Sequence, residues 1–210
     1  GIAYANKEKG KHIITSKIEH NAVLNSCERL EEQGFEITYL NVDQNGFVNL
    51  EELKNAIRED TILITIMFAN NEVGTIEPVE KIAEIAKNNN IIFHTDAVQA
   101  IGNVRIDVRK IGIDALSMSA HKFYGPKGIG ALYVRDDVNF QRIQDGGHQE
   151  RDKRAGTENV AEIVGMGKAI EMSYKNFDEH CNYLRDLRDY YIAKVEREIP
   201  NAKLNGDREK

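Results

Sequence analysis

A Gly- and Pro-rich turn separates two apolar runs in the segment Ala115-Leu-Ser-Met-Ser-Ala-His-Lys-Phe-Tyr-Gly-Pro-Lys-Gly-Ile-Gly-Ala-Leu-Tyr-Val134. The first run, residues 115–118, predicts a short buried strand, and the polar group Ser119-Ala-His-Lys122 follows where this strand ends. In open α/β sheets, ligands bind at the carboxyl ends of the strands. We therefore expect Lys122 at a ligand-binding edge of a sheet.

Lys122 has two interpretations. Most lysines beside a glycine turn are solvated surface groups. A partly desolvated lysine loses its proton more readily and can attack a carbonyl group to form a Schiff base, as pyridoxal phosphate chemistry requires. The second interpretation is favoured by residues 90–100, where an apolar strand pattern ends in His94, Asp96 and Gln99. An aspartate there would pair with the pyridine nitrogen and keep the ring protonated, so we expect pyridoxal 5'-phosphate as the cofactor.

Three motifs in a fixed order give the chain a close resemblance to a known family. They are His94-Thr-Asp-Ala-Val-Gln99, Ser119-Ala-His-Lys-Phe-Tyr-Gly-Pro-Lys-Gly-Ile-Gly130 and Arg154-Ala-Gly-Thr157. Together they closely resemble the cysteine desulfurases of the class V aminotransferase superfamily. The resemblance runs from about Lys11 to Asp207, and members of this family are considerably longer than this chain of 210 residues.

This resemblance implies a fold and an activity. The fold is the large cofactor-binding domain of the fold-type I pyridoxal-phosphate enzymes, truncated at both ends. The activity of the full-length protein is that of a cysteine desulfurase, a sulfurtransferase that converts L-cysteine to alanine and an enzyme persulfide. The sulfur would pass to iron-sulfur scaffold proteins or other sulfur acceptors. The chain alone is expected to be inactive, because in the family the persulfide cysteine and the arginine that grips the substrate carboxylate lie beyond it.

The resemblance also implies roles for individual residues. Lys122 holds the cofactor and abstracts the substrate Cα proton, and His20 stacks over the cofactor ring with a part in proton transfer. Asn71 reaches the ring oxygen and the substrate. Thr157 reaches across a homodimer interface to the cofactor phosphate of the other subunit. The implied catalytic residues are Lys122 and His20, and the implied cofactor-binding residues are Asn71, Asp96, Gln99, Ser119, His121, Lys122 and Thr157.

Plain structural roles remain open for several of these residues. Ser119 and His121, which the resemblance assigns to the cofactor phosphate, can equally be local caps. A histidine just before a helix, such as His20, is often a cap or a surface residue. Asn70 and Asn71 also fit an ordinary polar loop.

Strand and helix patterns alternate along the chain. Strand patterns occupy residues 11–16, 35–42, 61–68, 91–95, 115–118 and 130–134, and helical patterns occupy residues 22–34, 50–57, 78–88, 98–102, 108–111, 159–174 and 177–195. This alternation predicts an α/β fold with a mostly parallel sheet and helices on both faces. We assign residues 1–176 to the large domain, without its N-terminal part, and residues 177–210 to a long helix that leads into a C-terminal small domain.

Composition excludes some partners and locations. A formal net charge of -6 argues against nucleic acid and anionic membranes as partners, because these require clustered Lys and Arg. No apolar run approaches the roughly 20 residues that span a bilayer. Cys27 and Cys181 both fall in helical patterns, which favours packing roles and a reducing, cytoplasmic location without disulfides. The segment Gly1-Ile-Ala-Tyr-Ala-Asn-Lys7 has no initiator Met and has the character of mid-chain sequence.

Other functions compete with a cysteine desulfurase. A selenocysteine lyase or another class V lyase or aminotransferase would share every residue named above. The glycines of residues 125–130 do not form a nucleotide-phosphate loop, because they precede a strand and do not join a strand to a helix. A metal hydrolase built on His94, Asp96, His121 or His148 lacks an H-E-x-x-H or Cys-pair spacing, so no metal site is expected. A non-catalytic domain that binds partner proteins is the remaining class.

Overall fold

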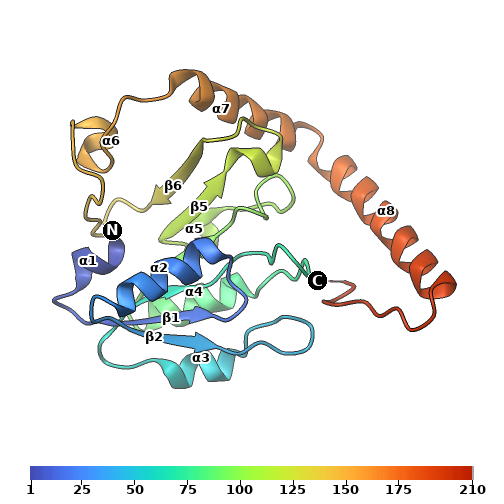
Figure 1. The fold of residues 1–210 in the computed structure, drawn as a ribbon, viewed down its shortest axis with the longest axis horizontal. Helices are drawn as coiled ribbons and strands as arrows, with labels where there is room; N and C mark the ends of the chain where they lie inside the picture. The colour runs from blue at the N-terminus through green and yellow to red at the C-terminus, as the bar shows by residue number, and fades with distance from the viewer. Residues whose placement is uncertain (210) are drawn as a thin grey trace.

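Six strands form one sheet in the order β2-β1-β3-β4-β5-β6 (Figure 1). The computed structural model describes residues 1–209. The strands are β1 (His12–Ser16), β2 (Glu36–Leu40), β3 (Thr61–Thr65), β4 (Ile92–Asp96), β5 (Ala115–Ser119) and β6 (Gly130–Val134). All neighbouring strands are parallel except β5 and β6, which are antiparallel. The prediction of a mostly parallel sheet is therefore confirmed.

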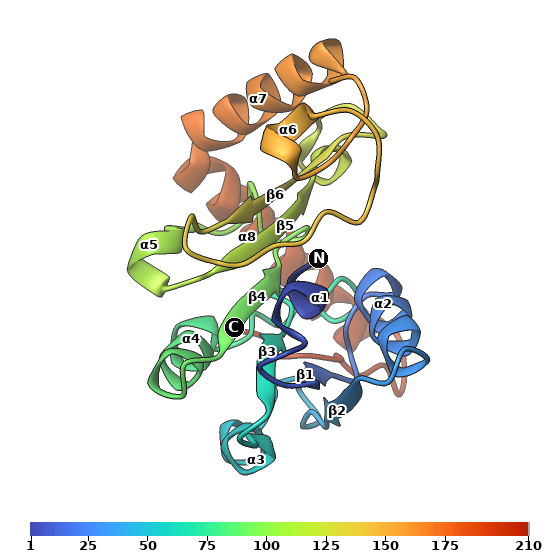
Figure 2. The ribbon, with the colours of Figure 1, turned by 90° about the vertical axis from the view of Figure 1, so that its left-hand side faces the viewer.

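Helices cover both faces of this sheet (Figure 2). They are α1 (Ile2–Asn6), α2 (Asn21–Glu31), α3 (Leu50–Ala56), α4 (Val79–Asn88), α5 (Val108–Ile111), the 3-10 helix η1 (Ala120–Phe123), α6 (Gln149–Asp152), α7 (Val160–Lys175) and α8 (Phe177–Glu198). Ile14 of β1 shares one apolar cluster with Ile82 of α4 and Met166 of α7. Ile13 shares the other cluster with Ile2 of α1, because successive side chains of a strand point to opposite faces.

The buried His12 keeps its hydrogen bonds inside the sheet. All five residues of β1 and of β3 are buried. The His12 Nδ1 atom lies 2.7 Å from Thr61 Oγ1, and its Nε2 atom lies 2.8 Å from Thr38 Oγ1. Burial lowers the pKa of His12, with the positive charge of Arg58 acting in the same direction. A neutral imidazole with both nitrogens paired can therefore replace an apolar residue inside the sheet.

Local signals set the ends of several elements. Asn49 caps α3, since its Oδ1 atom accepts hydrogen bonds from the backbone N–H groups of Glu51 (2.9 Å) and Glu52 (3.2 Å). Pro78 precedes α4 at a position where no helical donor is lost. Gly34 follows α2 with φ of +83°, a conformation that glycine adopts at little cost. These three boundaries agree with the sequence patterns.

Several elements differ from the sequence predictions, and the short helices η1 and α6 were not predicted. Residues 98–102 form successive turns and not the predicted short helix. Gly102 has φ of +83°, which interrupts a right-handed helix, and the Asn103 Nδ2 atom donates a hydrogen bond to the Gln99 carbonyl. The helix α1 was not predicted, because five residues are too few to show a periodicity. It forms because Ile2 and Ala3 bury their side chains against the sheet.

The chain bends at Asn176, and α8 extends away from the sheet (Figure 1). Tyr174 and Phe177 stack on the two sides of this bend, with ring centroids 5.2 Å apart. The Arg105 guanidinium lies 4.5 Å from the centre of the Phe177 ring and pairs with Asp178 at 2.9 Å. The start of α8 is thus attached to the segment before α5, whereas the remainder of the helix is largely exposed.

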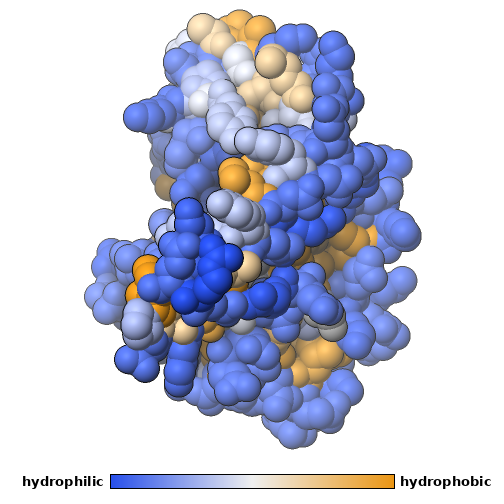
Figure 3. All heavy atoms as spheres, turned by 90° about the vertical axis from the view of Figure 1, so that its right-hand side faces the viewer, coloured by the Kyte–Doolittle hydropathy of each residue, from blue (hydrophilic) through white to orange (hydrophobic). Residues whose placement is uncertain are grey.

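Exposed apolar side chains concentrate on the last two helices. They are Val160, Ile163, Val164 and Met172 on α7, and Tyr183, Leu184, Leu187, Tyr190 and Tyr191 on α8. The face shown in Figure 3 is mostly hydrophilic but is interrupted by apolar patches. None of the helices within residues 1–209 is sufficiently long and apolar to cross a membrane.

The central strand β3 should dominate the stability of the sheet. Ile64 is fully buried and lies between β1 and β4. We expect Ile64→Ala to lower the free energy of unfolding by about 2–5 kcal/mol, because it removes buried methyl groups and leaves a cavity. Ile143→Ala, at a side chain that is 69% exposed, should change it by less than about 0.5 kcal/mol. Chemical denaturation would measure both, and similar losses for the two variants would contradict this account.

Candidate functional site

The candidate residues follow the ends of four parallel strands. His20 follows β1, Asn71 follows β3 and Asp96 ends β4. Lys122 lies on η1, directly after β5. Because β1, β3, β4 and β5 are mutually parallel along the sheet order, their carboxyl ends meet at one edge.

Lys122 is exposed on the tight turn between β5 and β6. The turn is closed by a hydrogen bond from the Gly125 N–H to the Ala120 carbonyl at 2.9 Å. Gly125 must be a glycine here, since a Cβ atom would lie 2.9 Å from the Ala120 Cβ atom. Tyr124 adopts the left-handed conformation with φ of +64°. The backbone thus fixes where the lysine side chain leaves the sheet.

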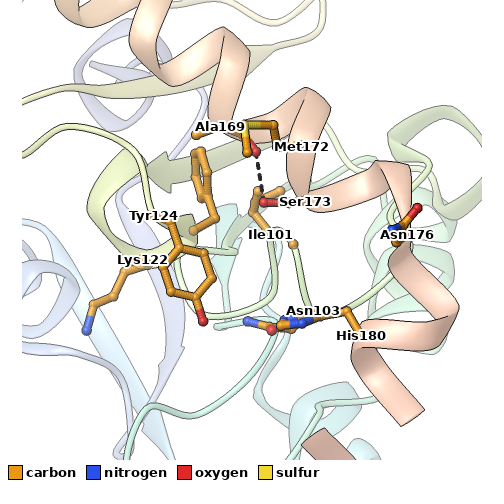
Figure 4. Close-up of a pocket in the computed structure, with 11 residues that line it drawn as sticks. Ile101, Asn103, Lys122, Tyr124, Ala169, Met172, Ser173, Asn176 and His180 are labelled. Atoms are coloured by element: carbon orange, nitrogen blue, oxygen red, sulfur yellow. Dashed lines mark hydrogen bonds between the residues drawn. The ribbon is translucent and has the colours of Figure 1, made fainter. Parts of the chain in front are cut away.

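A pocket of about 390 Å³ lies beside η1, and its lining includes none of His20, Asn71 and Asp96. Its lining includes Asn103, Lys122, Tyr124 and His180. Figure 4 shows the Lys122 side chain extending away from Asn103 and His180. The lysine nitrogen therefore points away from the part of the pocket lined by Asn103 and His180.

Ser119 and His121 flank the buried Ala120 at the start of η1. The Ser119 Oγ atom lies 2.8 Å from the His121 Nδ1 atom. Neither side chain caps η1, since its N-terminus has no side-chain hydrogen bond. The capping role that the sequence left open is therefore wrong for this helix. A hydroxyl and an imidazole therefore lie side by side directly after β5.

Asp96 is 7% exposed at the end of β4. Its Oδ1 atom accepts a hydrogen bond of 2.9 Å from the Val98 N–H, which fixes the orientation of the carboxyl group. Gln99 lies on the following turn and is half-buried. Its backbone carbonyl accepts the hydrogen bond from Asn103, which leaves its side-chain amide free of that contact.

His94 precedes Asp96 by two residues and lies on the same face of β4. Its Nδ1 atom lies 2.8 Å from Thr65 Oγ1, and its Nε2 atom lies 2.8 Å from Ser117 Oγ. Burial lowers the pKa of His94 to about 4. The imidazole is therefore neutral near pH 7 and bridges three strands.

His20 caps α2. Its Nδ1 atom accepts a hydrogen bond of 3.1 Å from the Ala22 N–H, so the ring proton of the neutral imidazole resides on Nε2. The ring is exposed. The cap that the sequence left open is thus present, and it still leaves the ring face and Nε2–H available.

Asn71 and Thr157 have few contacts of their own. The Asn71 side chain is half-buried and donates to Glu72 Oε1 at 3.1 Å. Thr157 is exposed on the segment between α6 and α7. The structure therefore brings Asn71 to the edge with the other candidates, whereas Thr157 lies on a different segment.

Sequence reasoning missed two buried residues at this edge, Glu19 and Asn70. Their side chains are 5% and 6% exposed, respectively, and each bonds to the loop that carries the other. The only local signal was the Ser-x-x-Glu spacing of Ser16 and Glu19, which is typical of a helix capping box. Here the Ser16 hydroxyl instead donates directly to the Glu19 carboxyl group at 2.7 Å.

No three His, Cys, Asp or Glu side chains within residues 1–209 gather closely enough to hold a metal ion. His94, Asp96, His121 and His148 thus form no metal centre among the described residues. The geometry gives no support to the hydrolase alternative.

The aminotransferase class-V family model matches residues 1–210. The chain belongs to this family. It is 59% identical over 209 residues to a cysteine desulfurase IscS of Clostridium botulinum, a match that covers 100% of this chain and 53% of that relative. The chain therefore spans about half the length of this curated relative. These findings confirm the resemblance inferred from the three motifs.

Solved structures of the family share this fold. A NifS-like protein superposes with a TM-score of 0.90 at 42% identity, covering 93% of this chain and 54% of that protein. SspA in complex with cysteine gives a TM-score of 0.78 at 47% identity, covering 81% of this chain and 50% of SspA. The architecture is therefore that of the fold-type I pyridoxal-phosphate enzymes.

The half-buried His94, both of whose ring nitrogens are paired, should make stability depend on pH. Its folded-state pKa of about 4 lies below the ordinary value of 6.5, so the unfolded chain takes up a proton first as the pH falls. The stabilisation is complete above the unfolded pKa and is lost as the pH falls from about 6.5 to 4, by on the order of 3 kcal/mol. Urea unfolding at pH values between about 4 and 6.5 would measure the free energy of unfolding as a function of pH. In His94→Gln, this free energy should vary less with pH over that range than in the wild type. His148→Gln, at an exposed side chain, should retain the wild-type slope.

Proposed function

We propose that the full-length protein is a pyridoxal-phosphate-dependent cysteine desulfurase. It would remove sulfur from L-cysteine, release alanine and pass the sulfur as an enzyme persulfide to an iron-sulfur scaffold or another sulfur acceptor. The observation that carries this proposal is the meeting of Lys122, Asp96, His20 and Asn71 at one edge of a parallel sheet. High identity to a cysteine desulfurase and likeness to a protein solved with cysteine support it.

The donor set at this edge fits pyridoxal phosphate. An exposed lysine, a buried carboxyl group and a neighbouring hydroxyl–imidazole pair correspond to the aldehyde, the pyridine nitrogen and the phosphate of that cofactor. Lys122 would hold the aldehyde carbon, and Asp96 would accept a hydrogen bond from the pyridine nitrogen. Ser119 and His121 would contact the phosphate. When bound, the cofactor supplies an electron sink for the substrate Cα carbon.

Chain residues supply the proton handling in this proposal. The Lys122 amine, once free of the cofactor, would take the Cα proton of the bound cysteine. His20 would lie over the ring with its Nε2–H directed outward, because Nδ1 is occupied by the cap of α2. Asn71 and Gln99 would add hydrogen bonds to the cofactor from the loops after β3 and β4.

Neither cysteine of this chain suits persulfide formation. Cys27 is 3% exposed within α2, and burial together with Glu19 and Glu31 raises the pKa of its thiol to about 12. A thiol of that pKa is almost never the reactive thiolate. Cys181 is half-buried, with its Sγ atom 3.6 Å from the Asn103 carbonyl. We therefore assign the persulfide cysteine to another part of the full-length protein.

The proposal extends to the arrangement of domains and subunits. Residues 1–176 would form the cofactor-binding domain, and α8 would lead into a smaller domain. Thr157 would contact the cofactor phosphate of a second subunit in a homodimer. Its exposure and the apolar side chains of α7 are compatible with such contacts.

The lysine assignment is testable by chemical trapping. Borohydride reduction of the cofactor-loaded full-length protein should fix a pyridoxyl group on Lys122, which peptide mass spectrometry would locate. Lys122→Ala should abolish the modified peptide, because no amine remains at the cofactor aldehyde. Lys127→Ala, at an exposed lysine in the same turn, should leave it unchanged. A pyridoxyl group at the same stoichiometry in Lys122→Ala would show that another lysine holds the cofactor.

Asp96→Asn should slow turnover far more than it weakens cofactor binding. The carboxylate favours the protonated pyridine ring, and this help is needed mainly in the carbanion-like transition state. We expect kcat for alanine formation from L-cysteine to fall by about a hundredfold or more, while cofactor content stays near that of the wild type. Asp136→Asn, at an exposed position, serves as the control. Loss of cofactor from Asp96→Asn, with normal turnover by the fraction that still holds cofactor, would refute this role.

Parallel assays of the wild-type protein with L-selenocysteine would identify a selenocysteine lyase.

A further inference from the structure

Two loops at the carboxyl edge have the same internal order, in which a buried residue directly precedes a candidate cofactor-contacting residue. In the loop after β1, the buried Glu19 precedes the exposed His20. In the loop after β3, the buried Asn70 precedes the half-buried Asn71. Consecutive Cα atoms are about 3.8 Å apart, so fixing the first residue of each pair confines the second.

Glu19 reaches from the first loop to the second. Its Oε1 atom accepts hydrogen bonds from the Ser16 hydroxyl at 2.7 Å and from the Met67 N–H at 2.8 Å. Ser16 ends β1, and Met67 lies just after β3. One carboxyl oxygen therefore connects the ends of two neighbouring strands.

Asn70 reaches in the opposite direction. Its Nδ2 atom donates to the Ile18 carbonyl at 2.9 Å, and its Oδ1 atom accepts from the N–H groups of Glu72 at 2.8 Å and Val73 at 2.9 Å. The amide thus holds the first loop with one end and shapes its own loop with the other. If Asn70 were removed, the buried polar groups that it contacts would lose their hydrogen-bond partners, and this loss would lower the stability of the two loops.

We propose that Glu19 and Asn70 form a reciprocal clasp between the two loops and act as positioning residues for His20 and Asn71. The clasp sets the distance between the loops, and with it the place of the imidazole ring and of the Asn71 amide at the carboxyl edge. This role rests on the proposed cofactor site, but the clasp itself does not require a bound cofactor.

The surroundings of Glu19 explain why its side chain acts as a neutral group. Burial raises its pKa to about 8, and the acidic groups Asp96 and Glu77 act in the same direction, against the two hydrogen bonds that it accepts. Cys27 also faces it from α2. Its Oε2 atom has no partner among the described residues, so no cation compensates a charge there. The pKa of Glu19 is about 8 in the closed clasp and near its ordinary value of 4.5 when the group is exposed, so the clasp should loosen progressively as the pH rises from about 4.5 to about 8.

Amide hydrogen exchange in the cofactor-free, full-length protein tests the clasp directly. Glu19→Ala should speed exchange at the Met67 N–H by about tenfold, and Asn70→Ala should do the same at the Val73 N–H. Glu59→Ala, at an exposed glutamate, should change neither rate. Unchanged exchange in both loop variants would overturn the clasp and would leave the proposed function standing.

A double-mutant cycle separates positioning from a general effect on stability. Glu19→Ala should weaken binding of pyridoxal phosphate about tenfold in the wild-type background, as measured by titration of the visible circular dichroism of the bound ring. In the His20→Ala background the same change should weaken binding by clearly less than tenfold, because one of the two residues through which it acts is gone. Additive losses would overturn the positioning role.

The pH dependence supplies a third readout. Wild-type affinity for pyridoxal phosphate should decline as the pH rises from about 4.5 to about 8, relative to Glu19→Gln, which keeps a neutral acceptor for Ser16 and Met67. Glu19→Gln should also retain slow exchange at Met67. The same pH profile in both proteins would contradict the part assigned to the Glu19 carboxyl group. Failure of Lys122 to carry the pyridoxyl group would instead overturn the cofactor site and leave the exchange result intact.

Discussion

The parallel hydrogen bonding of β1, β3, β4 and β5 is the constraint on which the candidate site depends. It aligns Thr15 with Thr65 and Thr65 with His94, so the four strands end at one edge. The next strand, β6, is antiparallel to β5. The connection of residues 120–129 is shorter than the dozen or more residues that a parallel crossover requires. Lys122 therefore lies on a tight turn, held close to the end of its strand.

Features that depend on neighbouring residues could be predicted from the sequence. An apolar run followed at once by polar residues placed Asp96 and Lys122 at strand ends, and the structure has both there. The parallel sheet followed from alternation, because each strand and its helix are local patterns. The turns at residues 98–102 were missed, since a helical pattern does not reveal the left-handed conformation of Gly102.

Contacts between distant loops could not be predicted in the same way. Glu19 and Met67 are 48 residues apart, and Asn70 and Ile18 are 52 residues apart. Glutamate and asparagine are ordinarily exposed, so their residue types predict a solvated loop. Their burial follows from the packing of two loops over adjacent strands, which no periodicity of either loop encodes. The sequence also left the role of His20 open. Its Nδ1 atom caps α2 and its Nε2 atom stays free, so a capping role and a role at the site are compatible.

The buried titratable groups at this edge share an electrostatic pattern. Burial raises the pKa of Glu19 to about 8 and that of Glu77 to about 7, and it lowers the pKa of His94 to about 4. Each shift favours the neutral form, because low-dielectric surroundings penalise charge of either sign. Asp96 ends β4 at the same edge, where its Oδ1 atom accepts a hydrogen bond from the Val98 N–H. In the proposed cofactor site, a buried cation such as a protonated pyridine nitrogen would gain from pairing with the Asp96 carboxyl group, and a neutral Glu19 would compete little for it.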